Sequence, residues 1–195
     1  MYAGIISHQA TIEQIDDVQE GGRVIRVLAP EIMDRVENGS SVNVAGVCLT
    51  ARDVDAQGFT ADVMPQTLSR TTMRDWKAGE TVNIEPSLRV GDEIGGHFVY
   101  GHIDNVAEVL SVEDEGNARV ILFETPIELL KWIVPQGSVA IDGVSLTVAS
   151  KTEETFSVSL IPETLARTTL KHLVAGSQVN VEVDMMMKGP YGATR

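Results

Sequence analysis

The chain has 195 residues, of which 43% are hydrophobic and 22% charged, and its formal net charge is −13. This length allows one or two domains with cores of modest size. The negative charge argues against binding to nucleic acid or to an anionic membrane surface, because both depend on basic side chains. It does not argue against a neutral small ligand.

The chain carries no signal for export or for membrane insertion. Its first 20 residues lack the basic and apolar regions of a signal peptide. No apolar run approaches the roughly 20 residues of a membrane-spanning helix. Cys48 is the only cysteine, so an internal disulfide cannot form. We therefore expect a cytoplasmic protein.

Short β-branched runs bounded by Gly, Asn and Pro predict strands along the whole chain. In the first half these runs are RVIRVLA (23–29), SVNVAGVCLT (41–50), FTADVMP (59–65) and TVNIEPS (81–87). In the second half they are FVYGHIDNVAEVLSV (98–112), ARVILFET (118–125), SVAIDGVSLTVAS (138–150) and FSVSLIP (156–162).

Helices are predicted to be few and short. Pro65 and Pro162 each stand where a short helix could begin. Thr125, followed by Pro126 and Glu128, has the spacing of a capping box, with the helix ending near Pro135. Many short strands with a few short helices favour closed or partly closed antiparallel barrels.

An internal repeat at a constant offset of 97 residues organises the sequence. Residues 64–85 align with residues 161–182, and eleven of these 22 pairs are identical. Residues 41–50 align with residues 138–147 at the same offset, and Gly4 aligns with Gly101. We therefore expect two tandem copies of one module. The first spans 1–97, including a Gly-rich linker over 86–97, the second spans 98–184, and a non-helical tail covers 185–195.

Residues that differ between the two copies indicate that the copies have different functional roles. Cys48 stands opposite Ser145, and His102 stands opposite Ile5. The barrel itself therefore requires neither the thiol nor the imidazole. Each polar group also has a structural interpretation: a lone Cys in a strand is usually a small buried hydrophobe, a lone His is more often a hydrogen-bonded structural residue than a catalyst, and Ser41 could simply begin a strand.

No motif for a cofactor, a metal or a phosphate is present in the sequence. The four histidines lack a convincing ligand spacing, and no GxGxxG or P-loop pattern occurs. We therefore expect chemistry that uses no cofactor and depends on acid–base or nucleophilic side chains.

Several motifs together resemble riboflavin synthase of the lumazine-binding family. They are MYAGII (1–6), NVAGVCLT (43–50), GGHFVYGHID (95–104), IDGVSLTV (141–148) and LIPETLARTT (160–169), and the resemblance runs from Met1 to about Asp184. It implies an all-β fold of two similar six-stranded antiparallel Greek-key barrels. It also implies a transferase reaction in which two molecules of 6,7-dimethyl-8-ribityllumazine exchange a four-carbon unit to give riboflavin and 5-amino-6-(D-ribitylamino)uracil.

The resemblance implies catalytic roles for Ser41, Cys48 and His102. His102 would move a proton near neutral pH, and Ser41 and Cys48 would activate water or add to the ring. It also implies two binding pockets. The first would be lined by Gly4, Ile5, Ile6, Cys48, Leu49, Thr50, Asp62, Val63, Met64, Pro65, Gln66 and Thr67. The second would be lined by Gly101, His102, Ile103, Gln136, Ser145, Leu146, Thr147, Ser159, Leu160, Ile161, Pro162, Glu163 and Thr164.

The chain departs from the family at three places. Tyr2 replaces the usual Phe, and Gln66 replaces a usual Glu. The family continues after residue 184 into a helix that assembles a homotrimer, whereas Gly189 and Pro190 here cannot continue a helix. Two functions therefore stay open: an active riboflavin synthase, or a non-catalytic relative that binds a lumazine or a flavin, as the lumazine proteins do.

Overall fold

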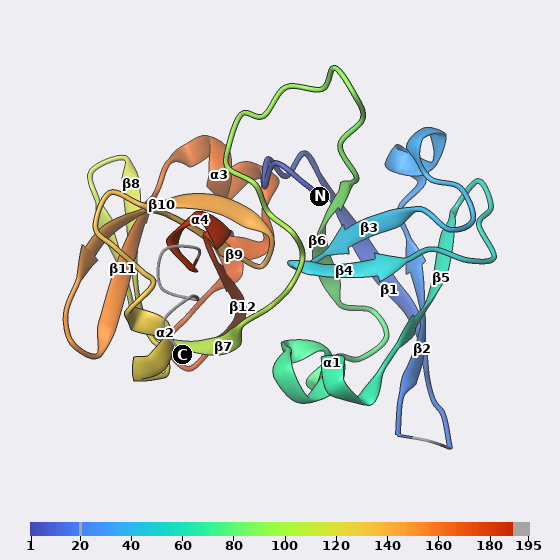
Figure 1. The fold of residues 1–195 in the computed structure, drawn as a ribbon, viewed down its shortest axis with the longest axis horizontal. Coiled ribbons are helices and arrows are strands. Elements are labelled where there is room, and N and C mark those ends of the chain that lie inside the picture. Colours follow the sequence, from blue (N-terminus) through green and yellow to red (C-terminus); the bar gives the residue numbers. More distant parts are fainter. Residues whose placement is uncertain (20, 189–195) are drawn as a thin grey trace.

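The computed structural model describes residues 1–19 and 21–188, which form two six-stranded antiparallel β-barrels (Figure 1). The strands of the first barrel lie in the order β4-β3-β6-β1-β2-β5, and a bridge between Arg52 and Thr60 joins its two ends. These strands are β1 (His8–Asp17), β2 (Arg23–Leu28), β3 (Ser41–Val44), β4 (Val47–Thr50), β5 (Gly58–Val63) and β6 (Thr81–Pro86).

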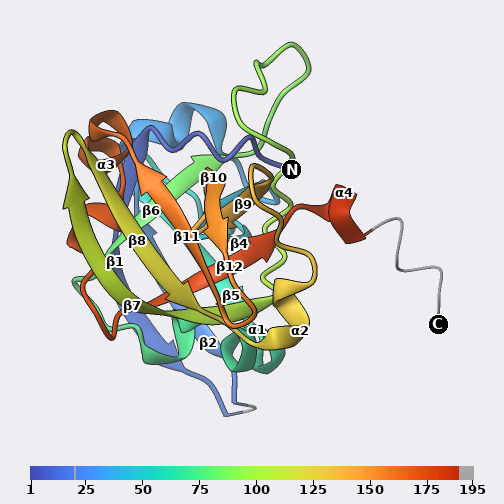
Figure 2. The ribbon, with the colours of Figure 1, turned by 90° about the vertical axis from the view of Figure 1, so that its left-hand side faces the viewer.

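The second barrel is fully closed and repeats the same connectivity, in the order β10-β11-β8-β7-β12-β9 (Figure 2). Its strands are β7 (Asn105–Glu115), β8 (Ala118–Glu124), β9 (Ser138–Ile141), β10 (Val144–Lys151), β11 (Thr155–Leu160) and β12 (Gln178–Val183). The predicted fold class of two six-stranded barrels with few short helices is confirmed.

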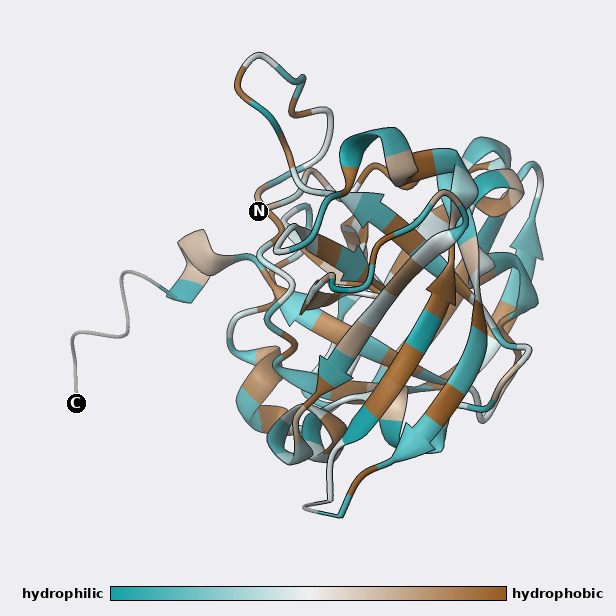
Figure 3. Cartoon of the chain, turned by 90° about the vertical axis from the view of Figure 1, so that its right-hand side faces the viewer, coloured by the Kyte–Doolittle hydropathy of each residue, from teal (hydrophilic) through white to brown (hydrophobic). Residues whose placement is uncertain are grey.

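Each barrel has its own apolar core, which follows from the period of two along its strands. In the β3–β4 hairpin, Val42 and Leu49 point into the first core, while Ser41, Cys48 and Thr50 lie on the opposite face. Figure 3 shows the same alternation of hydrophobic and hydrophilic positions along the strands. The hairpin thus presents a row of polar side chains outside the barrel that it closes.

Short helices connect the strands. Pro65 begins α1 (Pro65–Arg70) and Pro162 begins α3 (Pro162–Arg167), as the sequence predicts. Each is followed by a 3₁₀ turn, η2 (Thr72–Asp75) or η3 (Thr169–His172), and a further one, η1 (Pro30–Arg35), follows β2. No helix among the described residues is long and apolar enough to cross a membrane.

The predicted capping box at Thr125 is wrong. Pro126 is the N-cap of α2 (Ile127–Leu130), and no side chain caps this helix. Thr125 therefore precedes the cap by one residue, and its buried hydroxyl has no hydrogen-bond partner among the described residues. The helix ends at Leu130, well before Pro135.

The prediction of a non-helical tail is also wrong over its first residues, because Met185–Lys188 form one helical turn, α4. The Asp184 carboxylate accepts a hydrogen bond from the Met186 amide at 3.0 Å, as an N-cap does. Lys188 pairs with Asp104 at 2.5 Å. The rest of the predicted tail, residues 189–195, lies outside the described residues.

Two equivalent hairpin turns meet where the barrels touch. Ala45-Gly46 and Asp142-Gly143 all have positive φ, between 45° and 86°, as a tight hairpin turn of this kind requires. A Cβ atom on Gly46 would lie 2.9 Å from the Gly143 nitrogen. Only glycine therefore permits this close approach of the two barrels.

Two buried asparagines at equivalent positions connect the barrels. Asn180 of the second barrel donates to the Ala45 carbonyl at 2.8 Å and accepts from the Thr72 amide at 2.8 Å. Asn83 of the first barrel donates to the Asp142 carbonyl at 3.0 Å and accepts from the Thr169 amide at 2.8 Å. The two copies are thus joined by reciprocal hydrogen bonds.

Candidate functional site

The polar face of each hairpin forms the floor of a candidate site. In the first barrel, Ser41 pairs with Thr50 and Asn43 with Cys48, so these four side chains share one face. In the second barrel the equivalent pairs are Ser138 with Thr147 and Ala140 with Ser145. Both floors lie outside their barrel cores.

The segments that cover these floors are exchanged between the copies. The Cys48 amide donates to the Gly101 carbonyl at 2.9 Å, and the Ser145 amide donates to the Gly4 carbonyl at 2.8 Å. The prediction that Gly4 lines the same pocket as Cys48, and Gly101 the same pocket as Ser145, is therefore wrong. Each copy's leading segment lies on the other copy's hairpin.

Core packing shows the same exchange. Ile103 packs against the core of the first barrel, and Ile6 belongs to the core of the second. The side chains of Ile5 and His102, in contrast, are exposed. The first site therefore combines Cys48 and Thr50 with the 101–103 segment, whereas the second combines Ser145 and Thr147 with the 4–6 segment.

A buried carboxylate anchors each exchanged segment. Glu182 on β12 accepts hydrogen bonds from the amides of residues 100, 101 and 102 at 2.7–2.8 Å. Glu85 on β6 accepts from the amides of Ala3 and Gly4 at 2.9 and 3.1 Å. Burial raises the pKa of both carboxyls, for Glu85 to about 7, although the backbone N–H groups favour the charged form.

Cys48 and Ser145, which occupy equivalent positions on the two hairpins, have different side-chain partners. The Tyr2 hydroxyl donates to the Cys48 sulfur at 3.1 Å, and burial is the main cause that raises the pKa of Tyr2. In the second site, His97 Nδ1 lies 2.7 Å from the Ser145 hydroxyl oxygen. Burial lowers the pKa of His97, and its Nε2 atom has no hydrogen-bond partner among the described residues. Burial therefore disfavours the charged form of this imidazole beside the serine hydroxyl.

His102 lies where it could act on a ligand bound in the first site. It follows directly after Gly101, whose carbonyl is bound to the Cys48 amide. Its side chain is exposed, and its ring lies 6.3 Å from the ring of Tyr100, measured between centroids. His102 is thus held beside the first site through its backbone, and its exposed side chain is accessible there.

The predicted segments 62–67 and 159–164 occupy equivalent places at the ends of β5 and β11 and the starts of α1 and α3. Arg52 binds Asp62 through both of its oxygens, at 2.8 and 2.9 Å, and this pairing lowers the pKa of Asp62. Glu163 pairs with Arg167 one helical turn later. Both acidic residues therefore already have cationic partners.

Four of the predicted binding residues have side chains in the barrel cores. Leu49 and Val63 lie in the first core, and Ile6 and Leu160 lie in the second. They could meet a ligand only through their backbone. Gln136 is exposed, with φ of 65°, and its amide donates to the Val148 carbonyl at 2.9 Å.

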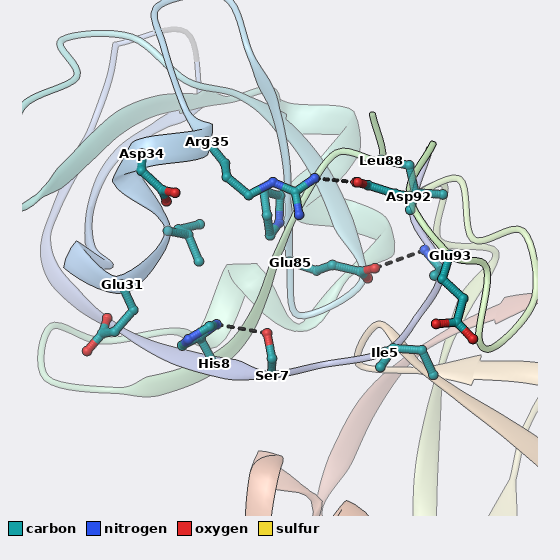
Figure 4. Close-up of a pocket in the computed structure, with 13 residues that line it drawn as sticks. Ile5, Ser7, His8, Glu31, Asp34, Arg35, Glu85, Leu88, Asp92 and Glu93 are labelled. Atoms are coloured by element: carbon teal, nitrogen blue, oxygen red, sulfur yellow. Dashed lines mark hydrogen bonds and ion pairs between the residues drawn. The ribbon is translucent and has the colours of Figure 1, made fainter. Parts of the chain in front are cut away.

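The cavity in Figure 4 lies beside the second site's covering segment and holds only Ile5 of the predicted residues. It has a volume of about 430 Å³ and contains Glu85, His8 and an ion pair of Arg35 with Asp92. Ser41 lines a neighbouring cavity of about 360 Å³. Neither of these two cavities is lined by Cys48 or His102.

Sequence reasoning missed Glu85 and Glu182 as site residues. A signal was present, because both glutamates end the repeated segment at equivalent positions, and a charged residue is unusual in a strand that is otherwise buried. The role of His97 was missed as well, because nothing local indicates that it reaches Ser145, which lies 48 residues away.

Comparison with known proteins places this geometry in a family. The family described as "Lumazine binding domain" matches residues 3–87 and again residues 100–184. The riboflavin synthase of Bacillus subtilis (strain 168) is 38% identical, over 98% of this chain and 88% of that protein. That of Chlamydia trachomatis serovar D is 41% identical, over 96% of this chain and 92% of that protein.

Solved structures agree with the sequence comparisons. LumP in complex with 6,7-dimethyl-8-(1'-D-ribityl)lumazine is similar with a TM-score of 0.84 and 25% identity, covering 94% of this chain and 99% of that one. LumP in complex with riboflavin has a TM-score of 0.84 and 26% identity over the same shares of the two chains.

Proposed function

The chain belongs to the lumazine-binding domain family, and from that premise we propose that it is a riboflavin synthase. Two molecules of 6,7-dimethyl-8-ribityllumazine would give one riboflavin and one 5-amino-6-(D-ribitylamino)uracil. The observation that carries the proposal is the likeness, at 38–41% identity over most of both chains, to proteins named riboflavin synthase. The proposal includes no cofactor, metal, nucleic acid or membrane.

The exchanged segments support a reaction between two like molecules. Each site combines a hairpin of one barrel with a segment anchored by the other barrel. A dismutation needs its two substrates held in a fixed relation, and such positioning lowers the barrier by up to about 7–11 kcal/mol in well-oriented cases. Two similar sites on one rigid frame suit that requirement.

Within this proposal the two sites have different tasks. His102 would take a proton from the C7 methyl group of one lumazine, because its exposed imidazole follows directly after the Gly101 carbonyl that binds the first site's hairpin. Cys48 would add to the ring of a bound lumazine or would orient the water that does so, and Ser41 is a further candidate for this role. The predicted binding residues would contact the pteridine and the ribityl chain.

A second function has its own support. The similar solved structures are complexes of LumP with a lumazine and with riboflavin. A carrier of one tightly held chromophore would use the same hairpin face. The presence of Cys48 and His102 together favours the enzyme, because a carrier needs neither a thiol nor a proton shuttle.

We propose that the protein works in the cytoplasm and assembles with copies of itself. The resemblance implies a homotrimer, and α4 supplies a single helical turn where the family's assembly helix would begin. Contacts between barrels would then have to contribute more to the assembly. Sedimentation of the purified chain would measure its mass, and a monomer that forms riboflavin would show that assembly is not needed.

Incubation with 6,7-dimethyl-8-ribityllumazine tests the enzyme against the carrier. The enzyme predicts absorbance growing in the flavin band, at a rate that falls sharply in His102→Gln. The carrier predicts a coloured complex and no riboflavin. An unchanged rate in His102→Gln would remove the imidazole from the mechanism while leaving the enzyme assignment in place.

A further inference from the structure

A carboxylate of the second barrel fixes the backbone around the one histidine of the first site. Glu182 Oε1 accepts from the Tyr100 amide at 2.7 Å, and Oε2 accepts from the amides of Gly101 and His102, each at 2.8 Å. Three charge-assisted hydrogen bonds on consecutive residues leave this stretch of backbone little freedom. Glu182 is 2% exposed, so water does not compete for these bonds.

The same stretch is fixed from the opposite side by the first barrel. The Gly101 carbonyl accepts from the Cys48 amide, and the Val99 carbonyl accepts from the Tyr2 amide. The backbone of His102 is therefore held between a carboxylate of one barrel and a hairpin of the other. We call this pair of attachments the clamp. The exposed His102 side chain extends from the backbone that the clamp holds.

Glu85 provides a comparison within the same chain. It stands at the equivalent position, 97 residues earlier, and it holds the amides of Ala3 and Gly4. The residue in the place of His102 is Ile5, which has no group that could transfer a proton. The clamp is thus common to both copies, and only the second copy's clamp carries an imidazole.

We propose that Glu182 is a positioning residue: it fixes the backbone from which the His102 side chain extends, next to the Cys48 hairpin, and so determines the rate of proton transfer. The inference rests on the proposed function for its kinetic test. It goes beyond that function because it assigns the position of a first-site group to a residue of the second barrel.

A double-mutant cycle measures how far the effect of Glu182 on kcat depends on the presence of His102. Glu182→Gln keeps the size of the side chain, but it replaces one accepting oxygen with an NH₂ group that faces backbone N–H groups. We expect kcat to fall about 10- to 100-fold, as displacement of a reacting group does, with KM changed less than about threefold. In a His102→Gln background the same change should lower kcat less than about threefold, because no imidazole is left to misplace.

Glu85→Gln is the matched control, since it removes the equivalent carboxylate from the clamp without a histidine. Its effect on kcat should be the same with and without His102. The inference is overturned if Glu182→Gln lowers kcat by equal factors in the two backgrounds, as a general structural defect would. Where circular dichroism shows that the Gln variant does not fold, Glu182→Asp, which keeps the charge but is one methylene shorter, takes its place in the same cycle.

A measurement without turnover separates this inference from the proposed function. Histidine ring signals can be followed by NMR in protein with labelled histidines, and His172 serves as an internal reference. Glu182→Gln should move and broaden the His102 signal, whereas Glu85→Gln should not. A chain that makes no riboflavin would refute the enzyme, and an unmoved His102 signal would refute the positioning role.

Discussion

Tyr2 and Val99 form an antiparallel bridge in which each backbone amide donates to the other's carbonyl oxygen, at 2.8 and 3.0 Å. These residues occupy equivalent positions in the two copies, 97 residues apart. Their pairing marks the point where the two leading segments pass each other. Each segment then continues onto the hairpin of the other copy, which makes both candidate sites composite.

The covering segment of the first site should not tolerate a side chain at Gly101. Its φ is 78°, and a Cβ atom there would lie 2.5 Å from the Cys48 Cβ and 2.7 Å from the Cys48 nitrogen. We expect Gly101→Ala to lower the free energy of unfolding by about 2–4 kcal/mol, from overpacking and from the left-handed backbone together. Riboflavin formation should fall at least about 100-fold, and denaturant unfolding and initial rates would measure the two effects.

Gly39→Ala isolates the backbone contribution to this effect. Gly39 has a similar φ of 91°, but a Cβ atom there would meet nothing within 4 Å. Gly39→Ala should lower the free energy of unfolding by roughly 1–2 kcal/mol, which is the cost of the left-handed conformation alone. Equal losses in the two variants would show that the close approach of Gly101 to Cys48 is not important.

The Tyr2 hydroxyl should stabilise the fold through the Cys48 sulfur. Tyr2→Phe keeps the buried ring and removes only the donor of the 3.1 Å hydrogen bond. We expect a loss of about 0.5–1.5 kcal/mol in urea unfolding, the usual net value of one hydrogen bond. In a Cys48→Ala background the same change should cost clearly less, and an equal cost there would assign the effect to other neighbours of the hydroxyl.

Stability should decrease as the pH rises through neutrality. Burial raises the pKa of Glu85 from 4.5 to about 7 and that of Asp142 from 3.8 to about 7. Between the ordinary pKa of each carboxyl and its raised value, the folded state therefore binds more protons than the unfolded state. Unfolding then releases protons, so a higher pH favours unfolding. Carboxyls whose pKa is lowered, such as Asp62, titrate below this window. His97, whose pKa is also lowered, contributes in the opposite direction near its own pKa, and the two carboxyls outweigh this single group.

We expect the free energy of unfolding to be larger at pH 5 than at pH 8, with Glu85 contributing up to about 3 kcal/mol of the difference. Urea unfolding over this range would measure the slope. Glu85→Gln should flatten it, since an amide does not titrate. A stability that increases from pH 5 to pH 8 would contradict the sign derived from these two carboxyls.

The contact between the barrels should depend on Asn180. Its side chain is fully buried and makes one hydrogen bond as a donor and one as an acceptor across the contact. Asn180→Ala would leave the Ala45 carbonyl and the Thr72 amide without partners, at about 1–3 kcal/mol each. Asn83→Ala should cost a similar amount in denaturant unfolding, and Asn117→Ala, at an exposed turn position, should cost little.

Much of the fold can be predicted from local sequence. The alternation in SVNVAGVCLT fixes which hairpin side chains enter the core, and the prolines at 65 and 162 fix two helix starts. The strand β1 (His8–Asp17) does not stand out, because HQATIEQIDD is largely polar and much of it is exposed. The Thr125 cap fails because Pro126 takes an extended conformation and moves the helix start by one residue.

The arrangement of the site is harder to predict because it depends on long-range packing. The repeat shows that Gly4 and Gly101 are equivalent, but it does not show which hairpin each segment covers. Both arrangements bury the same residue types, so composition and periodicity cannot distinguish them. Only the tertiary structure, through the contacts of Ile6 and Ile103 with opposite cores, reveals the exchange.

Product stoichiometry tests the central claim most directly. Purified protein would be incubated with 6,7-dimethyl-8-ribityllumazine, and substrate and products would be separated and quantified over many turnovers. We expect one riboflavin and one 5-amino-6-(D-ribitylamino)uracil for every two lumazines consumed. Lumazine that is bound by the protein and recovered unchanged would contradict the enzyme and identify the chain as a binding protein.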